Sequence, residues 1–317
     1  MRRLTGAQQT ALTSLRAAAG KLSRKYAPGP LRERPSQTAT AIQEWRGTAG
    51  RKLDLSAALL ALAVLADSAV EHYRGSFQNR LMYVPLGVSA ATLAAGLSGV
   101  FDERAKSHVV RDGLYGLAAL TGAIGLGFHA YNILKRPGGL SWLNLFYAAP
   151  IGAPVALALA GTLGRGAERI RDDEASTILR YPAGKALGLI ASAGLAGTVG
   201  EAALLHFRGA FHNPAMLLPV TLPPAAASLL ATSLFYPGKI LRGATKLFLN
   251  LTALLGFVGV GFHTYGVSRN MGGWKNWSQN ILNGPPLPAP PSFTGLALAG
   301  LAALSLIEKR ERGQFDD

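Results

Sequence analysis

Long apolar runs alternate with short polar stretches along the chain from residue 53 onward. Eight runs contain 16–22 residues each, which is close to the length that a helix needs to cross a bilayer. They cover residues 53–70, 81–100, 113–134, 145–163, 186–205, 215–235, 247–267 and 292–307. Arg, Lys, Gly and Pro dominate the connections. The pattern predicts an all-α integral membrane protein with eight transmembrane helices.

An internal repeat relates the two halves of the chain at an offset of 134 residues. His72-Tyr73-Arg74-Gly75 returns as His206-Phe207-Arg208-Gly209, and Gly-x-x-Gly-x-Gly-Phe-His at 122–129 returns at 256–263. Pro154 returns as Pro288, so the sequence suggests that no gap is needed. Four runs per copy give both copies the same orientation. We therefore expect two tandem, parallel four-helix repeats.

These patterns also set the expected domain boundaries. The first repeat covers residues 53–163, a cytoplasmic connector covers 164–185, and the second repeat covers 186–307. Residues 1–52 hold an amphipathic helix at 4–22 and a proline-containing linker at 27–52, and residues 308–317 form a tail. Residues 1–30 lack the continuous apolar core of a secretory signal peptide.

The placement of charge fixes the expected orientation. The chain is 49% hydrophobic and only 15% charged, whereas a soluble domain has about 25% charged residues. If the runs are numbered as spans, 25 of the 32 Lys and Arg residues lie with the two termini on one side, and 7 lie opposite. This asymmetry places both termini in the cytoplasm of a bacterial-type inner (plasma) membrane. The net charge of +15 then reflects topology and contact with anionic membrane lipids, and no basic–aromatic pattern indicates nucleic acid.

The residue inventory excludes several chemistries. Without cysteine, the chain cannot form disulfides, thiolate metal sites, iron–sulfur clusters or the covalent attachment of c-type haem. It contains no Walker-type phosphate loop and no convincing Ser–His–Asp arrangement. We therefore expect a non-catalytic membrane subunit rather than an enzyme.

Two equivalent histidine pairs are the main candidates for cofactor binding: His72 with His129, and His206 with His263. Each pair ends the first and third helices of one repeat, which are diagonal neighbours in a four-helix bundle. Facing imidazoles are the axial ligands of b-type haem iron. Small residues stand four and seven positions before the third-helix histidines and could leave a groove for the macrocycle: Gly122, Gly125, Gly256 and Gly259. The alternatives are interfacial histidines and close helix packing at the glycines.

Two acidic residues at equivalent positions form the second candidate site. Counting from Leu53 puts Asp67 about 20 Å into the bilayer, and its counterpart is Glu201. A buried acid is costly unless it is paired or functional. Either the acids pair with Arg74 and Arg208, or they relay protons or contact a polar substrate.

We therefore weigh three functions. The first is a membrane subunit of a redox complex, a b-type cytochrome with haem b at the two histidine pairs, which relays electrons and anchors other protein subunits. The second is a small-molecule or ion transporter that uses Asp67 and Glu201. The third is a structural subunit that binds lipid or pigment without a cofactor. An absorption spectrum separates the first from the others.

Overall fold

The computed structural model describes residues 37–104, 106–173 and 176–313, with side chains from residue 49 onward. The chain forms two compact units, 1–42 and 43–317, and the arrangement below concerns the larger one. Its helices are α2 (Gln37–Arg74), α3 (Val84–Phe101), α4 (Val109–Leu134), α5 (Trp142–Tyr147), α6 (Gly152–Asp172), α7 (Ala183–Arg208), α8 (Leu218–Ser233), α9 (Lys239–Arg269), α10 (Trp277–Asn283) and α11 (Pro291–Glu311). They are joined by the short 3-10 helices η1 (Arg80–Tyr83), η2 (Pro214–Leu217) and η3 (Gly273–Asn276), and by an antiparallel hairpin of β1 (Thr177–Ile178) and β2 (Tyr181–Pro182).

Seven segments of the described chain are long and apolar enough to cross a membrane, which confirms an all-α protein of the multi-pass membrane type. They are Ala49–Arg74, Arg80–Phe101, Val109–Leu134, Ala183–Arg208, Pro214–Ser233, Lys239–Arg269 and Pro291–Glu311. The predicted run 145–163 is not one continuous helix. It begins within α5, breaks at residues 148–151 and continues in α6 from Gly152 to Asp172. Pro150 disfavours helical geometry at the residue before it, which explains the break.

Two predicted boundaries are wrong. The linker predicted for residues 27–52 is helical from Gln37, because α2 begins there, after the last of the three prolines of this stretch. The connector predicted for 164–185 is helical up to Asp172, because α6 starts later and ends later than the apolar pattern indicates. The amphipathic helix predicted for residues 4–22 lies outside the described residues.

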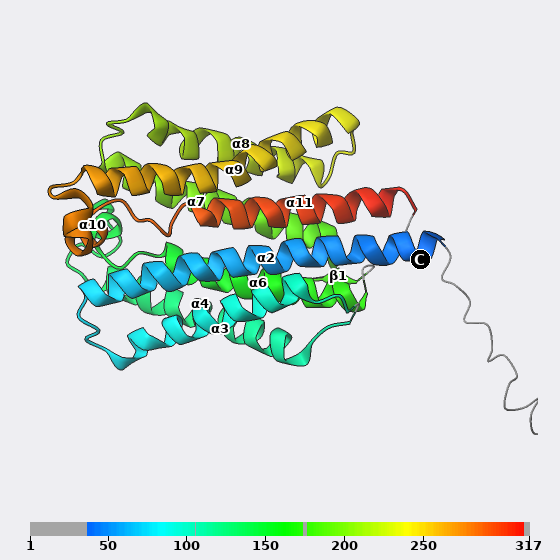
Figure 1. The fold of residues 1–317 in the computed structure, drawn as a ribbon, viewed down its shortest axis with the longest axis horizontal. Helices are drawn as coiled ribbons and strands as arrows, with labels where there is room; N and C mark the ends of the chain where they lie inside the picture. The colour runs from blue at the N-terminus through cyan, green and yellow to red at the C-terminus, as the bar shows by residue number, and fades with distance from the viewer. Residues whose placement is uncertain (1–36, 105, 174–175, 314–317) are drawn as a thin grey trace, which may run out of the picture. The chain divides into compact units, whose positions relative to one another are not determined.

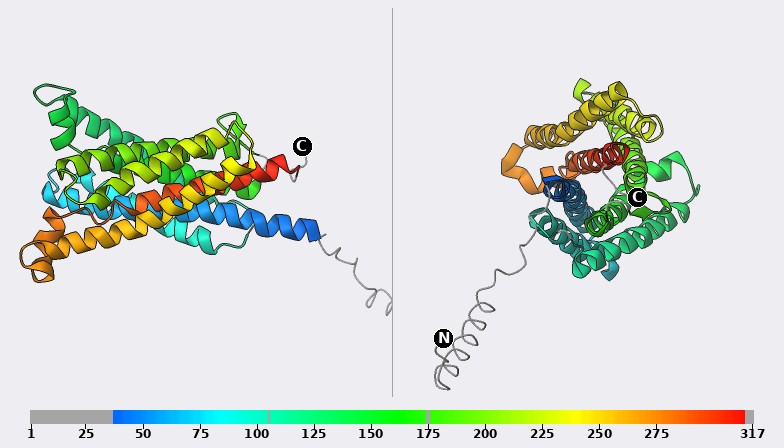
Figure 2. Two further views of the ribbon diagram at one scale, coloured as in Figure 1. Left: turned by 90° about the horizontal axis from the view of Figure 1, so that it is seen from above. Right: turned by 90° about the vertical axis from the view of Figure 1, so that its right-hand side faces the viewer.

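Helices α2 and α11 lie side by side in the middle of the bundle, with α3 and α4 on one side and α8 and α9 on the other (Figures 1 and 2). A Cβ atom at Gly295 of α11 would lie 3.1 Å from the carbonyl oxygen of Ser56 in α2. Helices α6 and α7 also pack together, and Gly166 faces Leu187 there. The first helix of each half thus contacts the last helix of the other half.

Within each half, the third helix packs closely along the last helix, α4 along α6 and α9 along α11. A Cβ atom at Gly161 would overlap the backbone of Tyr115 and Ala119 in α4. In the other half, Gly300 faces Leu249 of α9. Small residues therefore set the spacing of these helix pairs, as is common in membrane proteins.

A mutation can test this close approach. We expect Gly161→Ala to lower the free energy of unfolding by about 1–3 kcal/mol, because the added methyl group must push α4 away from α6. The matched control is Gly127→Ala in α4, because a Cβ atom there meets no atom within 4 Å. Equilibrium unfolding in mixed micelles measures both variants. Equal stability of the two variants would contradict the packing described here.

The same contacts recur in both halves, but their spacing changes near α10. His72 and His206 each bond to the backbone of the residue ten positions later. Asn144 donates to the carbonyl oxygen of Gly139 at 2.7 Å, and Asn280, 136 residues later, donates to that of Gly273 at 2.8 Å. In α6 and α11, the glycines 122 and 256 face Pro154 and Pro290, which are also 136 apart. The gap-free offset of 134 residues is therefore wrong beyond α10, where the second half has two extra residues.

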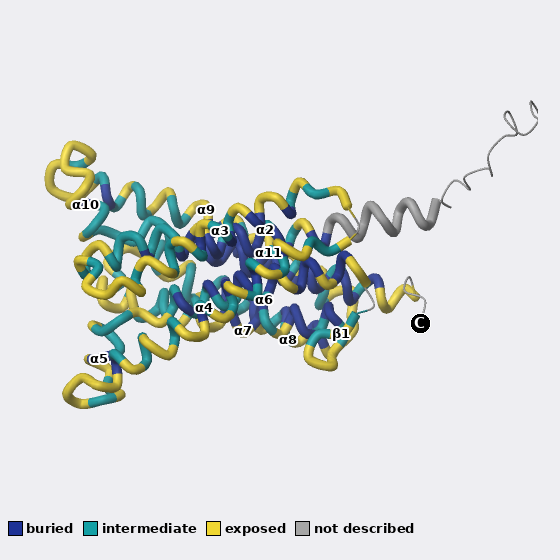
Figure 3. The backbone as a smooth tube through the Cα atoms, turned by 90° about the horizontal axis from the view of Figure 1, so that it is seen from below, coloured by how far each residue is buried: buried dark blue, intermediate teal, exposed yellow. Residues whose placement is uncertain are grey.

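Buried residues gather at one end of the bundle (Figure 3). We call the end that holds Asp54 and Arg171 the network end, and the end that holds His72 and His206 the histidine end. In α7 no residue after Leu195 is buried, and in α2 only Ser68 is buried after Val64. The polar residues of α2 and α7 at the histidine end thus lie in the less tightly packed part of the bundle.

Candidate functional site

All four candidate histidines are held in the same way, by a hydrogen bond from Nδ1 to a backbone carbonyl oxygen. In α2 and α7 the acceptors are Met82 at 2.7 Å from His72 and Met216 at 2.8 Å from His206. In α4 and α9, His129 bonds to the carbonyl of Pro150, and His263 to that of Pro286 at 2.6 Å. A carbonyl oxygen only accepts, so Nδ1 carries the proton. Each neutral imidazole therefore keeps its lone pair on Nε2.

A tight turn after α2 and after α7 fixes the first histidine of each pair. Phe77 donates its backbone N–H to the carbonyl of His72, and Phe211 does the same to His206, both at 3.0 Å. In each turn two consecutive residues have positive φ angles, 56° and 45° at Ser76 and Phe77. Such backbone is unfavourable for residues with a side chain, and its recurrence at residues 210 and 211 shows that both halves use the same geometry.

The structure brings the predicted pairs together electrostatically. His72 acts on His129 and His206 acts on His263, so the two imidazoles of each pair share one end of one half. Among the described residues, no group of three or more His, Asp or Glu side chains is arranged to hold a metal ion. A bare metal ion would thus find two protein ligands at each pair.

The predicted groove for a haem macrocycle does not fit the glycine positions. A Cβ atom at Gly122 would overlap the backbone of α6 at Pro154 and Ala158, and one at Gly256 would overlap Thr294 of α11. Gly125 and Gly259 face the rings of Pro154 and Pro290. These glycine faces are covered by neighbouring helices, so the groove prediction is wrong. Ligation of haem iron by the histidines stays a prediction without this support.

An absorption spectrum tests that remaining prediction. Because the glycine faces are covered, we expect protein purified from haem-replete cells to show no Soret band and no reducible α-band. The spectrum of His129→Ala should then be identical to that of the unmodified protein. A Soret band that is diminished in His129→Ala and in His263→Ala would reinstate the cytochrome interpretation.

The two candidate acids, Asp67 on α2 and Glu201 on α7, come together from the two halves. They are half-buried and close enough for their charges to repel. Glu201 accepts a hydrogen bond from the backbone N–H of Gly152, the first residue of α6 after its break. A carboxylate at this position is favoured by the helix dipole.

The predicted pairing of these acids with arginines is wrong. Arg74 forms its ion pair with Glu71 at 2.8 Å instead of with Asp67. Arg208 donates to the carbonyl oxygen of Phe146 and lies 4.9 Å from the ring centre of Tyr147. Asp67 therefore has no hydrogen-bond donor among the described residues. At the 136-residue spacing, the counterpart of Gly152 is Pro288, which has no N–H to offer.

A buried charged network at the network end was missed by sequence reasoning. Asp54 is 0% exposed and Arg171 only 4% exposed. Arg171 donates to the Asp54 carboxylate at 2.6 Å, and the Tyr115 hydroxyl donates to the other oxygen at 2.7 Å. Arg171 also donates to the carbonyl oxygen of Gly99 at 2.6 Å. The network thus joins α2, α3, α4 and α6.

The network continues toward the loop between α3 and α4. Arg111 donates to Glu168 at 2.7 Å and to Asp102 at 2.6 Å, and Arg104 donates to Asp102 at 2.9 Å. The hydrogen bonds from Arg104 and Arg111 hold the pKa of Asp102 well below its usual range. Three carboxylates and three guanidinium groups balance, so the network is neutral as a whole.

The second half of the chain has none of these charges. Asp54, Tyr115 and Arg171 correspond to Gly188, Leu249 and Ile307 when the two-residue insertion is counted. Leu249 and Ile307 are buried, so an apolar core stands where the first half has ions. The signal in the sequence was a charge inside an apolar run, Asp54, that the repeat does not reproduce.

Comparison of the chain with protein-family models, with curated proteins and with solved structures finds no match. The functional interpretation therefore rests on the geometry alone.

Proposed function

We propose that the chain is an eight-helix protein of a bacterial-type inner membrane, built as two tandem parallel repeats with both termini in the cytoplasm. Helix α6 serves as the eighth span, since its 21 residues are about 32 Å long. Its charged residues lie at the network end, where Glu168 and Arg171 have partners inside the protein. The reciprocal packing of α2 with α11 and of α6 with α7 supports a twofold axis along the membrane normal.

Reporter fusions test this topology. Fusions after Phe101, near Asp173 and at the C-terminus should report the cytoplasm, and fusions near Ser76 and Gly139 the opposite side. The charge asymmetry of the connections is the physical reason. A cytoplasmic reporter near Gly139 would remove α6 from the membrane and overturn the eight-helix arrangement.

Within this architecture we propose an ion or small-molecule transporter in which Asp67 and Glu201 hold a proton or a small cation. The observation that carries the proposal is the approach of these two acids at the contact between the halves. Two adjacent carboxylates repel, and a cation or proton between them removes the repulsion. Intramembrane acids of this kind mark ion pathways.

Helix breaks at matching positions support the same function. Residues 148–151 interrupt the chain before α6, and residues 284–290 separate α10 from α11. Breaks at corresponding positions of two repeats are typical of substrate sites in transporters. The first break delivers the N–H of Gly152 to Glu201, so movement of α6 would change the environment of this acid directly.

Flux measurements in liposomes test the transporter. The purified protein is reconstituted with an entrapped pH or sodium dye, and a potassium gradient with valinomycin supplies the driving potential. We expect a proton or sodium flux above that of protein-free liposomes, alone or on addition of amines or amino acids. Absence of flux under every condition would overturn the proposal.

A redox membrane subunit that anchors partner subunits is the second candidate. The fixed tautomer favours it, because all four histidines present Nε2 lone pairs that could ligate iron. The absorption spectrum described above decides between the two candidates.

A further inference from the structure

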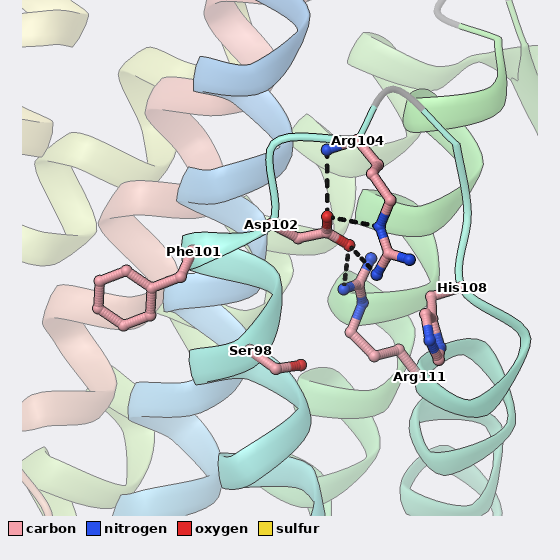
Figure 4. A pocket seen from close by; sticks show the side chains of 6 residues that line it. All are labelled: Ser98, Phe101, Asp102, Arg104, His108 and Arg111. Carbon is pink, nitrogen blue, oxygen red and sulfur yellow. Dashed lines mark hydrogen bonds and ion pairs between the residues drawn. The ribbon is translucent and has the colours of Figure 1, made fainter.

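A pocket of about 360 Å³ lies between the end of α3 and the beginning of α4, at the network end (Figure 4). It is lined by Ser98, Phe101, Asp102, Arg104, His108 and Arg111. Sequence reasoning set His108 aside as a loop residue, yet its imidazole borders this pocket in the close view. The pocket has no connection to Asp67 or Glu201, which lie toward the histidine end.

His108 supplies an unsatisfied polar atom. Its Nδ1 atom is buried and has no hydrogen-bond partner in the described part of the chain. The residue is the N-cap of α4, but its side chain makes no capping bond, while its backbone N–H donates to Glu168 at 2.5 Å. A buried polar group without a partner is costly, so a ligand that accepts or donates here would be stabilised.

The charges around the pocket leave one cation available. Asp102 is the only acid that lines it, and this carboxylate is already neutralised by Arg104 and Arg111. Arg104 bonds to Asp102 through Nε and Nη2, so the N–H groups on Nη1 stay available. The Arg104 side chain is 68% exposed and reaches solvent. An anionic group therefore has a guanidinium, an imidazole and the Ser98 hydroxyl within one pocket.

The surroundings of the pocket are apolar. Phe101 is 79% exposed and Val109 is 85% exposed, and both residues stand at the ends of helices suited to cross a membrane. Polar groups in a recess beside exposed apolar side chains match a lipid, whose phosphate lies at the membrane surface and whose chains lie below it.

We propose that this pocket binds the phosphate group of an anionic phospholipid from the leaflet at the network end. The proposal rests on the membrane-spanning arrangement proposed above, but not on transport by Asp67 and Glu201. The second half provides no copy of the site, because Arg104 corresponds to Gly238 and Arg111 to Thr245. Binding should therefore occur at one site per chain.

Native mass spectrometry of the full-length protein in detergent tests the site. Phosphatidylglycerol, phosphatidylcholine and inorganic phosphate are added in separate titrations. We expect one phosphatidylglycerol to bind more tightly than phosphatidylcholine, and Arg104→Gln and His108→Ala each to weaken this binding about tenfold, the effect of one lost charge-assisted hydrogen bond. Ser98→Trp, a substitution at an exposed position, should weaken binding by filling the pocket.

The matched control is Lys106→Gln, which removes one exposed positive charge from the same loop without touching the pocket. Its affinity should stay within twofold of that of the unmodified protein. Equal losses in Lys106→Gln and Arg104→Gln would show general attraction to a basic face and overturn the site. Inorganic phosphate that competes fully with the lipid, or unaltered binding in Ser98→Trp, would overturn the phospholipid assignment. Ion flux is measured separately, so failure of transport leaves this result unaffected.

Discussion

Arg171→Ala is expected to lower the free energy of unfolding by about 3–5 kcal/mol, because it leaves the carboxylate of Asp54 buried without its cation. Asp54 would keep only the Tyr115 hydroxyl as a side-chain donor. The carbonyl oxygens of Gly99 and Asp102 would lose donors as well. Equilibrium unfolding in mixed micelles, or the midpoint of thermal unfolding in detergent, measures the loss.

Arg165→Ala is the matched control for this prediction. Arg165 belongs to the same helix and pairs with Asp112 at 3.1 Å, but its side chain is 56% exposed. An exposed pair contributes about 0–1 kcal/mol, so the loss should be small. Comparable losses in the two variants would show that the buried network does not hold the helices together.

The second half of the chain suggests a rescue. A triple variant, Asp54→Ala with Tyr115→Leu and Arg171→Ile, gives the first half the kind of apolar core that the second half has. Replacing a buried ion pair by apolar residues is often neutral or stabilising, so the triple variant should recover most of the loss in Arg171→Ala. Continued instability would mean that the first half requires its ions for another reason.

Asp67→Asn and Glu201→Gln are expected to reduce ion flux in liposomes by at least about tenfold each, because a neutral amide cannot exchange a proton or hold a cation by charge. Glu201→Gln keeps an oxygen that can accept the hydrogen bond from Gly152, so folding should be preserved. The flux assay with a valinomycin-driven potential measures the effect, and thermal unfolding in detergent checks the fold.

Glu71→Gln is the control for the acid pair. Glu71 lies on the same helix as Asp67, but it is neutralised by Arg74 at the exposed end of α2. Its flux should stay within about twofold of that of the unmodified protein. Flux that survives in Asp67→Asn would remove this acid from the pathway, whatever Glu71→Gln shows.

The apolar pattern predicts most of the fold because a bilayer requires long uninterrupted apolar helices. It fails where local backbone chemistry decides the boundary. The prolines that break the chain before α6 move this helix toward Asp172, and the last turns of α6 are charged because Glu168 and Arg171 face protein instead of lipid. Hydropathy sums residues along the chain, so it cannot register partners on other helices.

The candidate site was predictable only where the repeat supplied a second copy. The four histidines and the two acids stood out because each occurs twice, and the structure places the members of each set near one another. Asp54, Tyr115 and His108 occur once and offered no such signal. The glycines were recognised as a special face, but whether a ligand or a helix covers that face is a property of the tertiary structure. The two extra residues near α10 also shift the match in α11, and only three-dimensional contacts reveal this shift.

The charged network also bears on the order of assembly during synthesis. Asp54 enters the membrane with α2, and its partner Arg171 is made 117 residues later, at the end of α6. All members of the network precede α7, so the ribosome completes the first half's polar core before it begins the second half. The nascent first half therefore possesses every cation that its buried carboxylates require. The second half, whose core is apolar at these positions, can then insert against a partner that is already closed.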